Sequence, residues 1–359
     1  MAYGAIDLHK KESQIRIVRD SGEVLDRRIA TTRDRLTAMF GEQPPMRVLV
    51  EAATESEWVA QHLETLGHEV IVADPNFAPM YGHRSRRVKT DRRDVAALAE
   101  ACQQGWYRAA HRRSATQRTV QIELNVRREL TDSRTRAISV VRAVIRGAGF
   151  RVRSGSTGSF LMRVSDLDLP PSMIETLGPL RTMIKVLTEE LARADERFTT
   201  IAADNPDVTR LMTVPGIGAI TATAYVAALD DAARFSRAGQ VASYLGLVPS
   251  EYSSGEQQRR GRVLRSAHPQ VQSLLVQAAW RMSRSKDPRT ARLRAWAQGI
   301  ARRRGQKIAM VALARRLARI LFAMWRDGVV YDGARIRLTS RHGTAPIGED
   351  ATKLAVTRE

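Results

Sequence analysis

The sequence predicts a mixed α/β fold for the first part of the chain and an all-helical fold for the remainder. Short apolar segments with the two-residue period of β-strands are confined to the first 75 residues. Apolar stripes with the period of an α-helix dominate from residue 116 onward. A chain of 359 residues is also too long for one compact core of the usual size, so two or three domains are expected.

The first domain should be built from five strands and three helices. The first three strands are expected to form an antiparallel meander, because the turn Asp20-Ser21-Gly22 separates two of them. The later strands alternate with helices, which gives the order β-β-β-α-β-α-β-α. The strands are expected at residues 3–8, 14–19, 23–30, 47–51 and 69–73, and the helices at 32–40, 56–66 and from 91 onward.

Four acidic side chains of this domain form a candidate metal site. Asp7 and Glu51 end separate strands, and such ends meet in one crevice of an open α/β sheet. Asp91 and Asp94 are three residues apart at the start of a helix, so they share one of its faces. If that face packs against the crevice, the four carboxylates converge and suit a divalent metal such as Mg²⁺ in phosphoryl transfer. Each acid taken alone fits a helix start or a surface charge at least as well.

The charge of the chain predicts a polyanionic partner. It has 58 Lys and Arg against 38 Asp and Glu, a formal net charge of +20 and a pI near 11.1, and nucleic acid is the commonest partner of such proteins. Residues 1–110 are nearly neutral, with about 16 basic and 16 acidic side chains. Residues 251–326 carry about 18 basic and 3 acidic side chains, so the polyanion should bind there. Aromatic residues make up only 5%, which disfavours a base-stacking single-strand binder.

Cysteine content and hydropathy predict an intracellular protein without a membrane span. Cys102 is the only cysteine, which excludes a disulfide framework and a cysteine zinc cluster. The sequence opens without a signal peptide, and its apolar runs are shorter than a membrane-spanning helix. A reducing compartment, the bacterial cytoplasm, is therefore expected, with no membrane partner.

Two long helices should form an arm in the middle of the chain. The first, over residues 116–149, carries one apolar stripe, and the second repeats apolar residues at spacings of four and three, as a coiled coil does. The partner of this second helix is either the first helix or the same helix of another subunit, and we expect both pairings. The first stripe is Ile122, Val126, Leu130, Ala137, Val141 and Val144; the second is Met173, Leu177, Leu180, Ile184, Leu187, Leu191, Ala194, Phe198 and Ile201.

The C-terminal part contains two segments suited to phosphate chemistry. Pro215-Gly216-Ile217-Gly218 between two helices suggests a helix-hairpin-helix, in which Gly216 and Gly218 let backbone amides approach phosphate; a tight turn is the alternative. Ser253 and Ser254 precede Gly255 in an expected loop, and a serine beside arginines could attack a phosphodiester, although Ser-Ser-Gly is also ordinary turn chemistry. The arginines are Arg259, Arg260, Arg262 and Arg265. Basic helices are expected at 269–283 and 302–325, and a polar tail follows residue 332.

Three blocks of the first domain resemble the DEDD transposases of bacterial insertion sequences, the family related to the Piv DNA invertase. The segments 215–218 and 246–262 resemble the C-terminal transposase domain of the same family, so the likeness extends in order over about residues 3–285. The chain departs from the pattern at Val95, where most relatives carry Ala, a conservative change on a buried face. The three blocks are Ala5-Ile6-Asp7-Leu8-His9-Lys10, Val50-Glu51-Ala52 and Lys89-Thr90-Asp91-Arg92-Arg93-Asp94-Val95.

This resemblance implies a fold and a mechanism. It implies a RuvC-like, ribonuclease-H-type domain that binds Mg²⁺ and a serine that joins covalently to DNA, with Ser254 as the match and Ser253 as the fallback. It also implies a structured non-coding guide RNA that pairs with donor and target double-stranded DNA, and a dimeric to tetrameric assembly in which one subunit's carboxylates meet another's serine. The metal ligands would be Asp7, Glu51, Asp91 and Asp94.

The predicted protein is therefore a transposase or site-specific recombinase of an insertion sequence. A RuvC-type metal nuclease resembling Holliday-junction resolvases, and a non-catalytic nucleic-acid-binding scaffold, are the alternatives. The predicted domains are a RuvC-like DEDD catalytic domain at residues 1–110, a helical coiled-coil arm at 115–204, a C-terminal transposase domain with the nucleophilic serine at 205–330, and a polar tail at 331–359.

Overall fold

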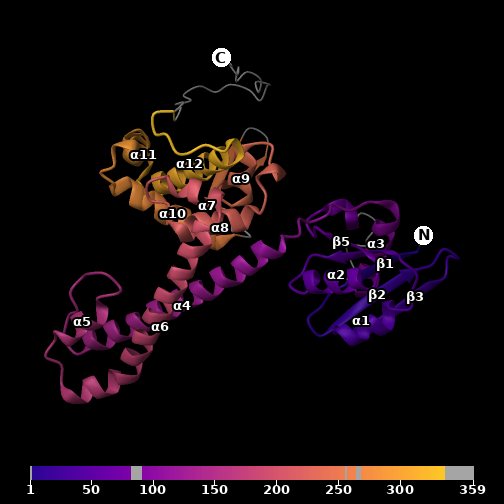
Figure 1. The fold of residues 1–359 in the computed structure, drawn as a ribbon, viewed down its shortest axis with the longest axis horizontal. Helices are drawn as coiled ribbons and strands as arrows, with labels where there is room; N and C mark the ends of the chain where they lie inside the picture. The colour runs from indigo at the N-terminus through magenta and orange to yellow at the C-terminus, as the bar shows by residue number, and fades with distance from the viewer. Residues whose placement is uncertain (1, 82–90, 255–256, 264–267, 336–359) are drawn as a thin grey trace. The chain divides into compact units, whose positions relative to one another are not determined.

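A computed structural model gives the fold and describes residues 2–81, 91–254, 257–263 and 268–335 (Figure 1). The chain divides into two compact units, Met1–Arg113 and Ser114–Glu359. The predicted basic loop before Asp91, and most of the predicted polar tail, lie outside the described residues.

The first unit contains a five-stranded sheet in the order β3-β2-β1-β4-β5. Strands β3, β2 and β1 are antiparallel neighbours, whereas β4 and β5 run parallel to β1, as βα connections require. The predicted strands at 47–51 and 69–73 have the predicted bounds. The strands are β1 Tyr3–Asp7, β2 Glu12–Val18, β3 Val24–Ala30, β4 Arg47–Glu51 and β5 Glu69–Ala73.

Helices cover both faces of this sheet. Helices α1 and α2 pack on one face, against apolar side chains that alternate along the strands, such as Ile6 and Val50. Helix α3 packs on the opposite face, where Ala5 and Leu49 contact it. This separation fixes which strand residues can meet α3. The helices are α1 Arg33–Phe40, α2 Ser56–Thr65 and α3 Asp91–Gln104.

The second unit begins with an arm of two long helices. Helices α4 and α6 pack against each other, and α5 lies at their far end, as Figure 1 shows. The predicted stripe of α6 is confirmed as its buried face, because Leu177, Ile184, Leu191 and Phe198 are buried at seven-residue intervals. The arm helices are α4 Ala115–Gly147, α5 Phe160–Ser165 and α6 Pro171–Ala203.

The predicted stripe of α4 is partly wrong. Ile122, Val126 and Val144 are exposed, whereas a neighbouring set of apolar residues is buried. Helix α4 carries apolar residues on more than one face, so periodicity alone did not identify the face that packs on α6. The buried set is Val120, Leu124, Ala137, Ile138, Val141 and Ile145.

The remaining helices form a core around α8, whose residues from Thr221 to Leu229 are all buried. The hydroxyl of Tyr225 donates a hydrogen bond of 2.7 Å to the carbonyl of Ala318, which ties α8 to α12. The expected basic helix at 302–325 is two helices, because Gly305 adopts a φ of 86° that ends α11. The core helices are α7 Pro206–Met212, α8 Ala219–Leu229, α9 Ala238–Tyr244, α10 Pro269–Arg284, α11 Ala291–Arg304 and α12 Gln306–Asp327.

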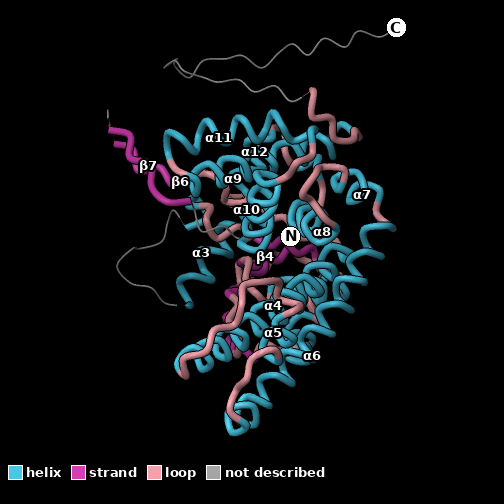
Figure 2. The backbone as a smooth tube through the Cα atoms, turned by 90° about the vertical axis from the view of Figure 1, so that its left-hand side faces the viewer, coloured by secondary structure: helices cyan, strands magenta, loops and turns pink. Residues whose placement is uncertain are grey.

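A two-stranded hairpin interrupts these helices between α9 and α10. It consists of β6 Pro249–Ser254 and β7 Gln257–Val263 and stands out to one side of the helices in Figure 2. The predicted loop is therefore wrong for Ser253 and Ser254, which belong to strand β6. Backbone pairing with the arginine-rich segment supplies the reason, since Ser254 pairs with Gln257 and Ser253 with Gln258.

Candidate active site and nucleic-acid interface

Asp7 and Glu51 lie at the same edge of the sheet. Asp7 is the last residue of β1 and Glu51 the last residue of β4. The two strands are parallel neighbours, and Ile6 is paired with Val50. Asp7 and Glu51 are the next residues of their strands. The parallel register therefore brings the two sequence-predicted acids side by side at the carboxyl ends of central strands.

Both acids face helix α3. Ala5 and Leu49, two residues before them, contact α3, and side chains two apart on a strand share a face. Asp94 lies one helical turn before Leu98, which packs on the same face of the sheet, and only 5% of Asp94 is exposed. Asp7 is 8% exposed. Three carboxylates thus come to one edge and one face, two of them almost completely buried.

Asp91 is the first residue of α3, three residues before Asp94. This position puts its backbone one turn nearer the helix start on the same face, while its side chain lies outside the described residues. Among the side chains that are described, no group of three or more His, Cys, Asp or Glu is arranged to hold a metal ion. The topology thus brings the predicted acids to one region of the sheet, but the described side chains are not already arranged as a complete set of metal ligands.

The donor set at this edge fits a hard divalent cation. Carboxylate oxygens are the ligands that Mg²⁺ prefers, and buried carboxylates on one face repel one another unless a cation lies between them. The low exposure of Asp7 and Asp94 makes that repulsion stronger than at the surface. Asp7, Glu51, Asp94 and, by its helical position, Asp91 are the residues that could hold such an ion.

His9 is a neighbour of this site that sequence reasoning did not single out. Its Nε2 lies 3.6 Å from Oδ2 of Asp7, and about half of its side chain is exposed. A protonated imidazole at this distance would compete with a metal cation for the carboxylate, whereas a neutral imidazole would not. The sequence feature that could have identified His9 is its position two residues after Asp7, just beyond the end of β1.

Asp26 on β3 fixes the start of α3. Its carboxylate accepts hydrogen bonds from Arg16 on β2, both at 2.7 Å, and from Nε of Arg92 on α3 at 3.2 Å. The hydrogen bonds from Arg16 and then from Arg92 hold the pKa of Asp26 below its ordinary value. Because Arg92 lies between Asp91 and Asp94, this contact positions the turn that carries both acids. No local pattern in the sequence indicated this long-range contact.

The candidate nucleophile lies in the second unit. The backbone of Ser254 ends β6, while Gly255 lies outside the described residues. On β7, the backbone of Arg259 pairs with Tyr252 and that of Arg260 with Glu251, and Arg262 lies in the same strand. Arg265 lies outside the described residues. The hairpin therefore brings the serine strand and most of the arginine cluster into one two-stranded element.

The glycine turn before α8 has the positive φ that the tight-turn alternative requires. Gly216 adopts a φ of +93°, a conformation that favours glycine. Gly218 precedes the first turn of α8 and offers no side chain to cap it. The first amide groups of α8 therefore donate no hydrogen bond to a side chain of the N-cap residue.

Helices α11 and α12 form the most basic part of the second unit. Between Ala291 and Arg326 the sequence contains ten Arg and Lys and no Asp or Glu. Many of these side chains are exposed, including the run Arg302, Arg303 and Arg304 at the end of α11. A concentration of exposed cations with few acids in the same segment suits a phosphate backbone. This agrees with the charge distribution of the sequence.

Comparison with known proteins identifies the family. A model of IS110-type DEDD transposases, described as "Transposase", matches residues 5–149, and a model described as "Transposase IS116/IS110/IS902 family" matches residues 208–294. The chain is 31% identical over 325 residues to a probable family 20 transposase of Pseudomonas aeruginosa, covering 89% of this chain and 95% of that protein. The chain belongs to the IS110 family of DEDD transposases.

Two further relatives carry insertion-sequence names. This DEDD transposase is 26% identical over 330 residues to the transposase for insertion sequence element IS1328 of Yersinia enterocolitica, covering 91% of this chain and 97% of that protein. It is 28% identical over 241 residues to the transposase for insertion sequence element IS1111A of Coxiella burnetii, covering 66% of each chain.

Family membership confirms the broad prediction and leaves the fine mechanism to experiment. A DEDD transposase of the IS110 family is the enzyme of an insertion sequence, binds and cuts DNA, and depends on a divalent metal. None of the helices in the described part of this transposase is long and apolar enough to cross a membrane. The parallel register of β1 and β4 agrees with the family's name, since it brings the first two acids of the motif together.

Proposed function

We propose that this transposase cuts and rejoins DNA through the hydroxyl of Ser254, with Mg²⁺ held by carboxylates of the first unit. The observation that carries the proposal is the position of the acids. Asp7 and Glu51 end parallel neighbouring strands, and buried Asp94 projects from the helix that packs on the same face. Asp91 would complete the set from the first turn of that helix.

The chemistry requires an activated hydroxyl and a stabilised transition state. The Ser254 oxygen would form a bond to phosphorus, and the bond from phosphorus to the sugar oxygen would break. The serine proton would leave as the sugar hydroxyl gains one, so the strand end remains attached to the protein. Mg²⁺ supplies positive charge that stabilises the phosphoryl oxygens. The β7 arginines and Arg265 would hold the same phosphate.

We further propose that a structured non-coding RNA selects donor and target double-stranded DNA, and that the arm joins subunits. The family resemblance supports the guide RNA. The seven-residue burial interval of α6, from Leu177 to Phe198, supports a coiled-coil arm, and the exposed apolar residues Ile122 and Val126 on α4 leave an apolar face for a second chain. The Gly216–Gly218 turn would act as a helix-hairpin-helix phosphate contact.

The deciding experiment traps the covalent intermediate. Full-length protein with Mg²⁺, guide RNA and a nicked donor duplex should give a DNA-linked band on a denaturing gel. Ser254→Ala and Asp7→Ala should each abolish the band and excision while RNA binding is retained. Ser243→Ala, at an exposed serine of α9, is the matched control and should leave both unchanged. If Ser253→Ala loses the band and Ser254→Ala keeps it, the nucleophile is Ser253.

The same experiment separates the alternatives. A RuvC-type nuclease would need the four carboxylates and water, so it would cleave with Mg²⁺ and leave no protein attached to DNA. A non-catalytic scaffold would bind without cleavage under any guide. Full activity in Ser254→Ala and Ser253→Ala would refute the serine mechanism, and full activity in Asp7→Ala would refute the metal site.

A further inference from the structure

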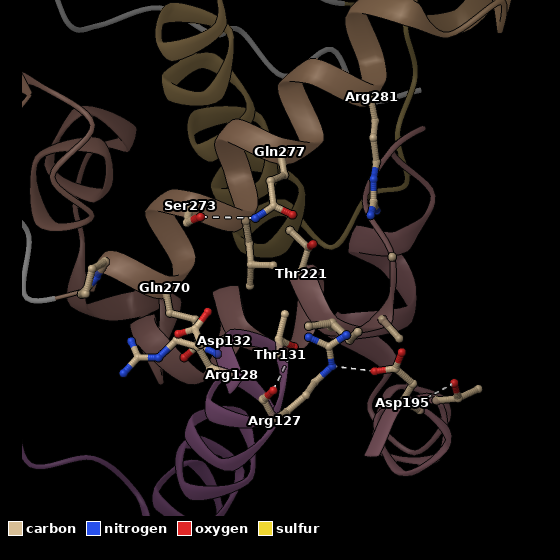
Figure 3. A pocket seen from close by; sticks show the side chains of 16 residues that line it. Arg127, Arg128, Thr131, Asp132, Asp195, Thr221, Gln270, Ser273, Gln277 and Arg281 are labelled. Atoms are coloured by element: carbon tan, nitrogen blue, oxygen red, sulfur yellow. Dashed lines mark hydrogen bonds and ion pairs between the residues drawn. The ribbon is translucent and has the colours of Figure 1, made fainter. Parts of the chain in front are cut away.

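A cleft of about 510 Å³ lies in the second unit, where the arm meets the helical core (Figure 3). Its lining comes from α4, α6, the first turn of α8 and α10. The volume is in the range of sites for small organic molecules, which is about 300–1,000 Å³. None of the predicted functional residues except Gly218 lines it.

The cleft is lined by one ion pair and by three further charged side chains. Nε of Arg127 on α4 donates to Oδ1 of Asp195 on α6 at 2.5 Å, so this pair joins the two arm helices. Arg128 on α4 and Arg281 on α10 are exposed, and neither forms an ion pair with another described side chain. Figure 3 shows these two arginines on opposite sides of the cleft. Asp132 on α4 is the third of these charged side chains.

The interior has polar and apolar surfaces in similar measure. Nε2 of Gln277 donates to the hydroxyl of Ser273 at 3.3 Å, which fixes the amide and leaves its carbonyl as an acceptor. Ile220 and Leu274 supply apolar surface. A site for phosphate alone would not include Asp132, because a carboxylate repels phosphate. A nucleobase, by contrast, needs an acceptor for its amino or imino group and apolar surface for its faces.

We propose that this cleft binds one unpaired nucleotide of a nucleic-acid strand, an inference that rests on the proposed nucleic-acid function. Arg128 and Arg281 contact phosphates of the strand, and the base enters between Ile220 and Leu274. Asp132 accepts a hydrogen bond from the base, as carboxylates do from cytosine or guanine. The base is held by hydrogen bonds and aliphatic surface, which needs none of the aromatic platforms used by general single-strand binders.

The position of the cleft gives this binding a consequence. Arg128 and Asp132 belong to the arm, whereas Arg281 and Gln277 belong to the core. A nucleotide in the cleft would contact both elements at once, so its binding should stabilise the junction between them. Extruded or looped nucleotides occur in RNA and at distorted DNA junctions, and the phosphate and base chemistry of the two sources is shared.

The test compares two labelled duplexes of the same sequence, one fully paired and one with a single bulged cytidine. Each is prepared as DNA and as RNA and titrated with the full-length protein. The wild type should bind the bulged form about tenfold more tightly than the paired form, as DNA, as RNA or as both. This is the discrimination expected of one good base contact. Asp132→Ala, which removes the acceptor, should abolish most of this preference, whereas Asp132→Asn, which keeps an acceptor oxygen and removes the charge, should retain more of it.

Arginine variants test the phosphate contacts. Arg128→Gln combined with Arg281→Gln should weaken binding of the bulged form and lower the dependence of log affinity on log salt by about 1.5, as expected for two lost contacts. Arg146→Gln is the matched control, because Arg146 is an exposed arginine of the same arm helix near its other end. It should leave the preference for the bulge unchanged. All three cleft residues are exposed, so these substitutions should preserve folding.

Three results would overturn the inference. The first is equal affinity for paired and bulged forms in both DNA and RNA. The second is a preference that survives all cleft substitutions. The third is tighter binding of every duplex by Asp132→Asn, which would mark the carboxylate as a mere repulsive charge. If one of these three results is obtained and the covalent Ser254 adduct still forms, only the cleft assignment is refuted. If the wild type forms no adduct, the proposed function is refuted independently of the cleft.

Discussion

Metal binding at the carboxylate edge should be visible in thermal stability. The perturbation is Asp94→Asn, which removes one buried charge while keeping the side-chain shape. In the wild type, Mg²⁺ at a hundredfold excess over its Kd should stabilise the first unit by about 2.7 kcal/mol. For a unit the size of Met1–Arg113, that free energy corresponds to a rise in Tm of roughly 10 °C.

The assay is differential scanning calorimetry of the full-length protein with EDTA and with increasing Mg²⁺. The transition of the first unit should move upward in the wild type and much less in Asp94→Asn. Glu42→Gln, which neutralises an exposed carboxylate in the same unit, is the matched control and should respond to Mg²⁺ as the wild type does. An equal shift in Asp94→Asn and wild type, or no shift in either, would refute the placement of a metal among these acids.

Three further predictions concern the fold that supports the sites. Gly216→Ala should lower the stability of the second unit by about 1–3 kcal/mol in urea unfolding, since its φ is +93°, whereas Gly299→Ala within α11 should raise it by up to about 1 kcal/mol. Tyr225→Phe should cost about 1 kcal/mol, because the buried hydrogen bond from the Tyr225 hydroxyl to the carbonyl of Ala318 is lost; an unchanged urea midpoint would contradict this. Asp26 has a folded pKa below its ordinary 3.8, so it stabilises the fold above that pH and loses this effect as pH falls through the folded value. In a plot of unfolding free energy against pH, Asp26→Asn should therefore make the acidic part of the curve less steep.

Local pattern was sufficient for most elements of the first unit. The strands at 47–51 and 69–73 were predicted at their observed bounds, because continuous apolar runs between turn residues leave little alternative. The positions of Asp7 and Glu51 at strand ends followed from the same runs. The contact between Asp26 and Arg92 could not be predicted, since it joins residues 66 apart that only the packed sheet brings together.

Local pattern was less informative in the second unit. The stripe of α6 was predicted correctly, since its heptad spacing repeats along most of the helix, although Ile174, Met183 and Val186 lie outside the stripe and are exposed. Helix α4 has several apolar faces, and only packing selects one. The serine pair was expected in a loop because Ser and Gly favour turns, yet cross-strand pairing with the arginine segment makes it part of a strand. Strand pairing of this kind depends on a partner segment, which a local window of sequence does not contain.

The sequence by itself determined the composition, the family motifs and the apolar periodicities, and therefore the mixed fold, the basic C-terminal part and the DEDD transposase identity. Only the tertiary structure decided that Asp7 and Glu51 lie side by side, that α3 covers their face, and that Arg128, Asp132 and Arg281 share a cleft. The physical reason is that hydrophobic burial is encoded by nearby residues, whereas a binding site depends on strand register and helix packing between distant ones.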